Sequence, residues 1–246
     1  MYGVDPNLAA KFYRYYKSYL GITSEFENVF ACEQRTKPIN FDFFQFLITT
    51  QINERLIFSI APAFYQEFSK LIELNLFETM DDELINALHT FFYCKFSNYS
   101  IRTMYRLTVD LPREFQVGDA RALTINDKEL FINTGKKSRE YKEEQWNIRK
   151  EIIENGRFFV VIKNDKIISW AEVSNICFNG GNLVVMTLPE YRNSGYGRMV
   201  VAKAVNWCAE NNILPIYWVD SSNISSIKLA SSLGFNLMNK ELVVSI

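Results

Sequence analysis

Residues 188–198 are the stretch of this sequence whose types and spacing most directly indicate chemistry. They follow an apolar run at 184–187, typical of a strand, and precede a segment with the apolar spacing of a helix. The first turn of a helix has backbone N–H groups without partners and a partial positive charge, and glycines such as Gly195 and Gly197 let a bulky anion approach the main chain. A diphosphate would fit this turn, although turn geometry and close packing explain two glycines equally well.

Two common phosphate-binding loops fit the turn poorly, because it lacks the third glycine of the dinucleotide fingerprint and the Lys-Ser/Thr ending of nucleotide hydrolases. The pattern Arg192-x-x-Gly195-x-Gly197 after a strand resembles the coenzyme A motif of the GNAT superfamily, Arg/Gln-x-x-Gly-x-Gly/Ala. A second feature follows in the family's order, since Asn223 lies just after the next predicted strand and starts a helix that ends at Gly234 and Phe235. The resemblance covers residues 117–246 and is strongest from residue 157 onward.

This resemblance implies an N-acetyltransferase that moves an acetyl group from acetyl-CoA to a primary amine of a small molecule or peptide. Acetyl-CoA is then a co-substrate, and no metal is implied. Backbone N–H groups of Asn193 to Arg198 would hold the diphosphate, Met186 to Leu188 would pair with the pantetheine arm like an added strand, and Asn223 would bond that arm from the other side. The implied cofactor-binding residues are Met186, Thr187, Leu188, Arg192, Asn193, Ser194, Gly195, Tyr196, Gly197, Arg198 and Asn223.

Amine acetylation needs a neutral amine, whereas a lysine-type amine has a pKa of about 10.4, so a base or a desolvating environment is required near pH 7. The candidate bases are Asp220, at the end of a predicted strand at 216–219, and Glu172, on a predicted strand at 167–174. Carboxylates at such positions are more often surface charges or helix caps than catalytic bases. Many GNAT relatives place a tyrosine, as general acid, where this chain has Ala230. A thiol with a pKa of about 8.5 needs little protonation to leave.

Ala230 and the absence of an unmistakable base leave an alternative of another class, a noncatalytic CoA-binding sensor module. That alternative predicts cofactor binding without turnover. Neither hypothesis identifies the acceptor amine, because such specificity depends on loops and on the shape of a pocket.

After residue 156 the apolar residues recur with a period of two, in short runs, and this pattern predicts the strands and helices that position the turn. Strands are expected at 157–163, 167–174 and 183–187, with turns at 164–165 and 179–181, which predicts three consecutive antiparallel strands. A helix at 198–210, a strand at 216–219, a helix at 224–233 and a closing strand at 242–246 follow. The order strand, helix, strand from 183 to 219 requires two parallel strands in one sheet.

The preceding residues predict a helix at 6–20 that stops at Gly21, a buried strand at 55–62, helices at 63–76 and 81–92, and a charged helix at 129–155. We therefore expect an α/β (α+β) fold with a GNAT-like, mainly antiparallel sheet flanked by helices and parallel strands that splay at the cofactor site. Turn residues near 110–119 predict a boundary, with a mixed α/β unit at 1–112 and a GNAT domain at 113–246. The first unit would shape the acceptor site or mediate homodimerisation.

Composition excludes several other classes of protein. Lys plus Arg number 27 and Asp plus Glu 28, with no basic stripe, so nucleic acid is not an expected partner. No apolar run approaches the roughly 20 residues of a membrane span, and the start has no cationic and apolar leader, which predicts a cytoplasmic protein without a membrane partner. Four scattered cysteines and one histidine predict neither a zinc site nor disulfides.

Overall fold

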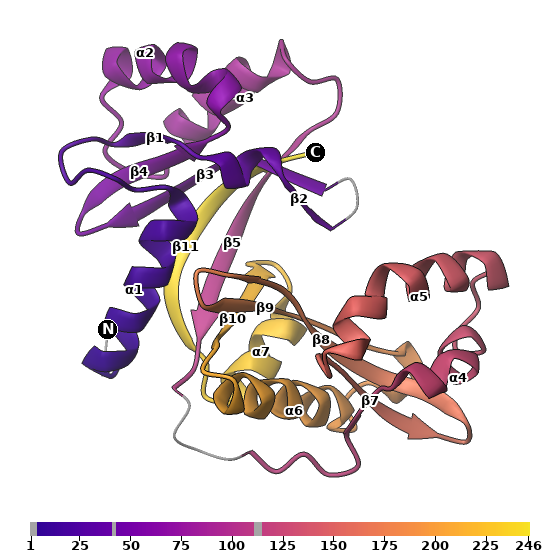
Figure 1. Ribbon diagram of the computed structural model, residues 1–246. Helices are drawn as coiled ribbons and strands as arrows, with labels where there is room; N and C mark the ends of the chain where they lie inside the picture. The colour runs from indigo at the N-terminus through magenta and orange to yellow at the C-terminus, as the bar shows by residue number, and fades with distance from the viewer. Residues whose placement is uncertain (1–3, 41–42, 111–114) are drawn as a thin grey trace. The chain divides into compact units, whose positions relative to one another are not determined.

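The computed structural model describes residues 4–40, 43–110 and 115–246, which form two compact units (Figure 1). Unit 1 comprises the described residues up to Leu107, with Trp218–Ile224 and Leu237–Ile246, and unit 2 comprises the described residues of Thr108–Tyr217, with Ser225–Asn236. The chain passes between the units four times, inside the strands β5 (Ser100–Thr108), β10 (Leu214–Asp220) and β11 (Asn236–Ser245) and at the start of helix α7 (Ile224–Ser232). The boundary expected between residues 112 and 113 lies outside the described residues.

Helix α1 (Pro6–Leu20) begins unit 1 with the ends that its sequence predicts. The Asp5 carboxylate accepts hydrogen bonds from the N–H groups of Asn7 at 2.6 Å and Leu8 at 3.3 Å, and Pro6 occupies the first turn, where no N–H is needed. Gly21 ends the helix with a φ of 73°, a left-handed conformation that glycine adopts without strain. The helix buries Leu8, Phe12, Tyr15, Tyr16 and Leu20.

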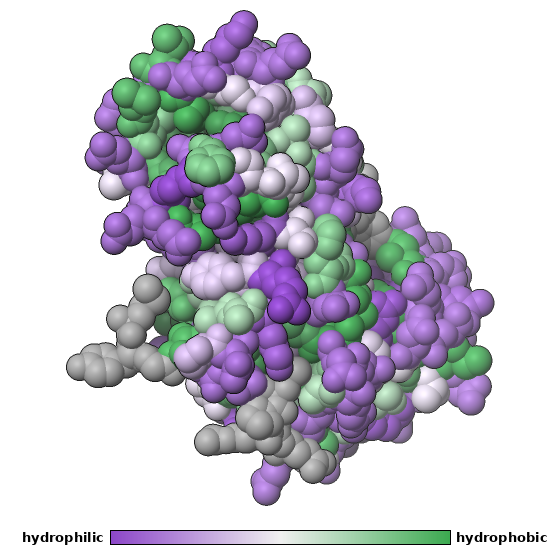
Figure 2. Space-filling model, turned by 60° about the vertical axis from the view of Figure 1, so that its left-hand side comes forward, coloured by the Kyte–Doolittle hydropathy of each residue, from purple (hydrophilic) through white to green (hydrophobic). Residues whose placement is uncertain are grey.

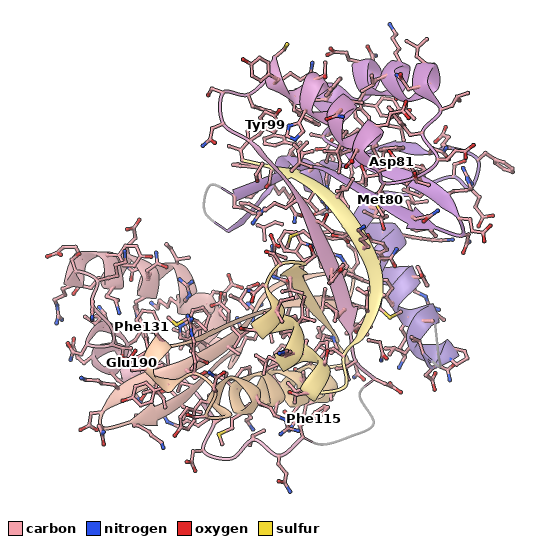
Figure 3. All side chains as sticks on the ribbon, turned by 180° about the vertical axis from the view of Figure 1, so that it is seen from behind. Met80, Asp81, Tyr99, Phe115, Phe131 and Glu190 are labelled. Carbon is pink, nitrogen blue, oxygen red and sulfur yellow. The ribbon has the colours of Figure 1, made fainter. Side chains whose placement is uncertain are left out.

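The sheet of unit 1 has the strand order β1-β4-β3-β11-β5, with β2 paired to β3. Strand β3 (Phe43–Ile52) is antiparallel to both β4 and β11, whereas β1 is parallel to β4. A hydrophobic core that includes Phe58, Phe68 and Phe92 joins the sheet to helices α2 and α3. Asp81, seen at the start of α3 in Figure 3, caps that helix. The remaining elements are β1 (Val29–Ala31), β2 (Pro38–Asn40), β4 (Arg55–Ile60), α2 (Tyr65–Asn75) and α3 (Asp82–Tyr93).

Unit 1 also contains a buried polar group, the Glu241 cluster, made of Tyr15, Tyr16, Arg106, Trp218 and Glu241. The fully buried Glu241 carboxylate accepts hydrogen bonds from Tyr16 Oη at 2.6 Å, Arg106 Nε at 2.6 Å, Arg106 Nη2 at 3.2 Å and Trp218 Nε1 at 2.9 Å. Arg106 also donates to Tyr15 Oη at 3.2 Å. The buried charge pair is thus surrounded by the hydrogen bonds that such a pair needs.

The sheet of unit 2 has the order β10-β9-β8-β7-β6, with β10 included as far as Tyr217. Strands β7 (Phe158–Lys163), β8 (Lys166–Cys177) and β9 (Gly180–Thr187) are consecutive and antiparallel, and β9 is parallel to β10. The three antiparallel strands and the parallel pair were both expected and are confirmed. Asn164 and Asp165 join β7 to β8 with φ values of 49° and 55°, as a tight hairpin requires. Strand β6 (Arg121–Ala122) pairs with β7.

Helices cover both faces of the unit 2 sheet (Figure 1). Helix α6 (Tyr196–Glu210) packs on one face of β7, β8 and β9. On the other face, Trp146 of α5 (Arg139–Glu154) packs with Phe158 and Val160 of β7. Phe131 of α4 (Lys128–Ile132), labelled in Figure 3, lies against the rings of Trp146 and Phe158. The last helix is α7 (Ile224–Ser232), and 3-10 helices occur at Glu33–Thr36, Pro62–Phe64, Ile125–Asp127 and Pro189–Tyr191.

One expected helix was wrong in extent. The segment 129–155 forms two helices, α4 and α5, because Gly135 takes a φ of 78° between them and Ser138 caps the start of α5 by accepting from the Tyr141 N–H. The fold class is confirmed as a mixed α/β fold with a mostly antiparallel sheet flanked by helices.

The part of the chain that the structure describes has no helix both long and apolar enough to cross a membrane. Within those same ranges, no group of His, Cys, Asp and Glu side chains has the arrangement of a metal site. The face drawn in Figure 2 is mainly hydrophilic, with hydrophobic side chains interspersed. Cys32 and Cys208 are buried free thiols and Cys94 is an exposed one.

Candidate active site

The turn between β9 and α6 contains the predicted phosphate-binding residues. After Thr187 the chain forms the 3-10 helix Pro189–Tyr191, Asn193 takes a φ of 62°, and Gly195 takes a φ of 82° as the residue before α6. Residues 192–195 are exposed. Glu190, labelled in Figure 3, lies on the same turn. The turn is therefore an exposed loop that leads directly into the first turn of a 15-residue helix.

The two glycines serve different purposes. At Gly195 a side chain would be strained by the positive φ, yet an added Cβ would meet no atom within 4 Å, so the space in front of the turn is open. At Gly197 an added Cβ would lie 3.2 Å from Thr187 Oγ1 and 3.4 Å from Leu229 Cδ2. Gly195 thus sets the direction of the chain, and Gly197 allows α6 to lie close to the end of β9.

The first turn of α6 presents N–H donors without a side-chain cap among the described residues. The Met199 N–H bonds to the Gly195 carbonyl at 3.1 Å, so the amides of Tyr196, Gly197 and Arg198 precede the helical ladder. Arg192 folds back, and its Nε donates to the Thr187 carbonyl at 3.3 Å, while the Ser194 hydroxyl donates to the Arg192 carbonyl at 3.4 Å. This arrangement provides several amides and the positive end of a helix dipole for an anion.

Lys163 adds a cation to the turn that sequence reasoning missed. Its Nζ hydrogen-bonds Tyr196 Oη and lies 4.6 Å from the centre of the Tyr196 ring, which in turn meets the ring of Tyr191. The hydrogen bond to Tyr196 raises the pKa of the Lys163 ammonium, which keeps it charged. Lys163 is the last residue of β7, immediately before the hairpin turn, and the packing of α6 on β7 brings it to Tyr196.

Alternate residues of strand β9 direct their main-chain N–H and C=O groups toward the neighbouring strand β8. The Leu188 N–H donates to the Ile168 carbonyl at 2.9 Å, and the Leu188 carbonyl accepts from the Tyr191 N–H at 2.9 Å, so both main-chain groups of Leu188 are used within the protein. Met186 is paired with Trp170 in the same register and also belongs to the bonded side of the ladder. The main-chain groups of Val185 and Thr187 accordingly point toward the edge away from β8. The period of two in a strand groups Val185 with Thr187, and the register shows that their main-chain groups are not the ones bonded to β8.

Glu172 lies on the α5 face of the unit 2 sheet. Its carboxylate is 3% exposed and is paired with Arg149 of α5, whose Nε lies 3.1 Å from Oε2. Burial raises the pKa of Glu172, although the charges of Arg149 and Arg157 oppose that shift. The hydroxyls of Ser169 and Thr187, 2.8 Å apart, belong to the alternate residues that face α6. The Glu172 carboxylate is therefore on the other face of the sheet from the contact between Thr187 and Gly197.

Asp220, the last residue of β10, and Asn223, three residues later, both belong to unit 1. The Asp220 carboxylate accepts from the Ser222 hydroxyl at 2.6 Å and the Ser222 N–H at 2.8 Å, and these bonds, the hydroxyl first, lower the pKa of Asp220. The Asn223 N–H donates to the Asp220 carbonyl at 2.9 Å, one residue before α7. Asp220 is therefore ionised at neutral pH, and it is partly exposed whereas Glu172 is buried.

Ala230 is fully buried in α7, within unit 2. It offers no hydroxyl for protonation of a leaving group. The hydroxyls of Tyr217 and Ser226 lie 2.7 Å apart in the same unit, and burial raises the pKa of the Tyr217 phenol. Tyr217 is therefore a protonated, largely buried side chain near neutral pH.

Comparisons with known proteins identify the family. A family model described as GNAT acetyltransferase matches residues 43–241. A curated relative, the uncharacterized N-acetyltransferase YdfB of Bacillus subtilis (strain 168), is 29% identical over 136 residues, which are 55% of this chain and 50% of the relative. The chain thus spans about half the length of that relative.

Two solved structures are similar in fold. An acetyltransferase from the GNAT family of Colwellia psychrerythraea aligns with a TM-score of 0.54 and 12% identity, over 99% of this chain and 98% of that chain. A GCN5-related N-acetyltransferase from Sphaerobacter thermophilus aligns with a TM-score of 0.50 and 10% identity, over 81% of this chain and 75% of that chain. At such identities these likenesses show the fold alone.

The family match begins at residue 43, far before residue 117, where the resemblance in the sequence begins, and so it includes most of unit 1. The turn from Arg192 to Gly197 lies within it and has the geometry that its glycines predict. Because the family model matches most of its length, this chain belongs to the GNAT acetyltransferase family, a family of acyltransferases.

Proposed function

We propose that the chain transfers an acetyl group from acetyl-CoA to a primary amine. The observation that carries the proposal is the exposed turn before α6, where Gly195 takes a left-handed conformation, the space in front of it is open, and the first helical amides have no side-chain cap among the described residues. A diphosphate is the part of coenzyme A that such a turn binds, because it accepts several N–H bonds and carries negative charge at the positive end of a helix.

The contacts of the cofactor follow from the same geometry. The amides of Asn193 to Arg198 bind the diphosphate, with Lys163 and Arg192 adding positive charge. The main-chain groups of Val185 and the N–H of Thr187 pair with the amides of the pantetheine arm, since the main-chain groups of Leu188 and the Thr187 carbonyl are bonded within the protein. Asn223 is proposed, as the family resemblance implies, to bond the arm as well.

The chemical step is nucleophilic attack of a neutral amine on the thioester carbonyl. A C–N bond forms, the C–S bond breaks, the thiolate of CoA leaves, and the ammonium proton passes to a base. We assign Asp220 as that base, because its carboxylate is ionised and partly exposed, whereas Glu172 is buried against Arg149. Desolvation lowers the pKa of the amine and so eases its deprotonation, and the lowered pKa of Asp220 keeps the carboxylate ionised and able to accept the proton at neutral pH.

The cofactor site is tested by Gly195→Glu, which places a negative side chain in the open space before α6. We expect isothermal titration calorimetry to show CoA binding by the wild-type protein and a loss of at least about 100-fold in affinity in the variant, because the carboxylate occupies the space and repels the phosphates. Gly156→Glu is the matched control, since Gly156 also has a positive φ, of 66°, in unit 2, and the nearest atom to an added Cβ there is 4.0 Å away. Equal affinities in the two variants would refute the assignment.

Turnover is tested by the release of free thiol from acetyl-CoA over a panel of primary amines. We expect release that depends on the amine and that Asp220→Asn slows at least about 100-fold, as is typical for loss of a general base. Glu172→Gln should retain the rate once its thermal stability is accounted for. Binding of CoA without release of thiol for any amine would favour the noncatalytic sensor, and slowing by Glu172→Gln alone would exchange the roles of the two carboxylates.

A further inference from the structure

The sheet face of unit 1 that carries the Glu241 cluster carries a second arginine in a different environment. Arg102 precedes Arg106 by four residues on β5, so both side chains leave the strand on the same face. On the neighbouring strand β11, Ser245 follows Glu241 by four residues and meets Arg102 as Glu241 meets Arg106. A serine thus stands opposite Arg102 where a carboxylate stands opposite Arg106.

The guanidinium of Arg102 has few acceptors. Its Nη2 donates to Ser245 Oγ at 3.4 Å, a long bond to a hydroxyl that is also 3.0 Å from Ser100 Oγ. Its Nε is buried without a hydrogen bond, and no carboxylate of the described chain forms an ion pair with it. The ring of Phe43 lies 5.3 Å from Cζ. A guanidinium has five N–H donors, so Arg102 can donate hydrogen bonds to the carboxylate of a bound ligand, a partner that the described protein lacks at this position.

The segment that contains Asp220 lies beside Arg102 within unit 1. The Ser221 N–H donates to the carbonyl of Thr103 at 2.9 Å, and the ring of Trp218 lies 6.4 Å from that of Phe43. The charge of Arg102 contributes to the lowered pKa of Asp220, after the two hydrogen bonds from Ser222. A cation and an anion that are close in space, but do not form an ion pair with each other, are complementary to a ligand that carries both charges.

We propose that Arg102 binds a carboxylate of the acceptor, and that the acceptor is an amino acid whose amine lies at Asp220. This inference rests on the proposed function and names its substrate class. Phe43 and Trp218, both half-buried, provide apolar surface for the carbon atoms between the two charged ends. A guanidinium recognises a carboxylate in two parallel hydrogen bonds, which selects a free acid over its neutral carboxamide.

Paired acceptors test this specificity. The value of kcat/KM is measured for amino acids and for the corresponding amino acid amides, which have the same amine and no carboxylate. The wild-type protein should prefer the acids, and Arg102→Met should lower kcat/KM for the acids about 10- to 100-fold more than for the amides, the range for hydrogen bonds to charged groups. Loss of the Arg102 charge also affects Asp220, but equally for both members of a pair, so the ratio within a pair isolates the carboxylate. Arg14→Met, at an exposed arginine of α1, should leave the ratio unchanged.

An equal loss for acids and amides, or a wild-type preference for the amides, would overturn the proposal. Arg102→Lys, which keeps the charge without the planar pair of donors, should retain part of the preference and guards against a variant that fails to fold. A second measurement does not depend on turnover, namely calorimetric titration of the same amino acids into the CoA-loaded protein. Binding by the wild type that Arg102→Met abolishes supports the anion site even if no thiol is released, whereas no binding, or equal binding, refutes it.

Discussion

The Glu241 cluster of unit 1 and the turn before α6 in unit 2 are both dense in strong hydrogen-bonding groups, but they use them in opposite ways. In the cluster, one buried carboxylate accepts four hydrogen bonds from Tyr16, Arg106 and Trp218. At the turn, the amides of Tyr196 to Arg198 precede the helical ladder and have no side-chain cap among the described residues. Buried polar groups need hydrogen-bond partners inside the protein. Exposed donors do not, because water bonds them until a ligand replaces it.

This difference between the buried cluster and the exposed turn predicts which substitutions change stability and which change binding. Substitutions in the cluster should change the free energy of unfolding, and substitutions at the turn should change affinity for the cofactor. Arg102 is intermediate, because its Nε is buried like the groups of the cluster but, like the amides of the turn, has no acceptor among the described residues. The predictions below are ordered from the largest expected effect to the smallest.

Glu241→Gln should cause the largest loss of stability. The amide has the same shape but no charge, so Arg106 remains buried without a counter-ion, which costs about 3–5 kcal/mol of the free energy of unfolding. Urea denaturation followed by circular dichroism measures the change. Glu129→Gln, in the exposed pair with Arg139, is the control and should cost less than about 1 kcal/mol. Similar losses in both variants would contradict the distinction.

Ser222→Ala should move the acid limb of the pH profile of kcat/KM. The Ser222 hydroxyl bonds the Asp220 carboxylate and stabilises its ionised form, so its removal raises the pKa of Asp220, and activity should be lost at a higher pH as the solution is acidified. The Ser222 N–H bond remains in the variant and limits the shift. Ser225→Ala, at an exposed position in α7, is the control. A profile that does not move would argue against Asp220 as the base.

Lys163→Met should weaken cofactor binding only slightly. The ammonium is exposed and is held beside the turn by Tyr196, so its charge is screened by water and salt, and we expect the Kd for CoA to rise about two- to fivefold at low ionic strength. The difference between variant and wild type should shrink in 0.5 M salt, roughly the regime in which exposed charges are strongly screened. Lys203→Met, on the exterior of α6 beyond the first turn, serves as the control. A salt-independent loss would indicate a packing role for Lys163.

Local signals predicted much of the fold. Asp5, Pro6 and Gly21 define the ends of α1, because capping residues and stop residues act within one turn of a helix. The turn from Arg192 to Gly197 could be predicted because glycine is the residue that adopts a left-handed conformation without strain, as Gly195 does. The same signals, overlooked at Gly135 and Ser138, would have divided the helix expected at 129–155. Strands β3 and β5 were not predicted, although they form much of the unit 1 sheet.

Contacts between distant residues could not be predicted in this way. Glu241 and Arg106 are 135 positions apart, and Lys163 and Tyr196 are 33 apart, so no periodicity joins them. The family was predicted from two motifs and is confirmed by the match over residues 43–241. The assignment of the cofactor residues and of the bases stays a prediction. Only the register of β8 and β9 shows which β9 residues direct their main-chain groups away from β8.

Because three strands pass between the units, we expect that neither unit can be expressed as a separate, folded fragment. Strand β3 pairs through Leu47 to Thr50 with β11, which comes from the last residues of the chain. A fragment of residues 1–112 would lack that neighbour and expose the hydrogen-bonding edge of a central strand, so it should aggregate when expressed alone. Insertions and tags are therefore better placed in surface turns than at the apparent midpoint of the sequence.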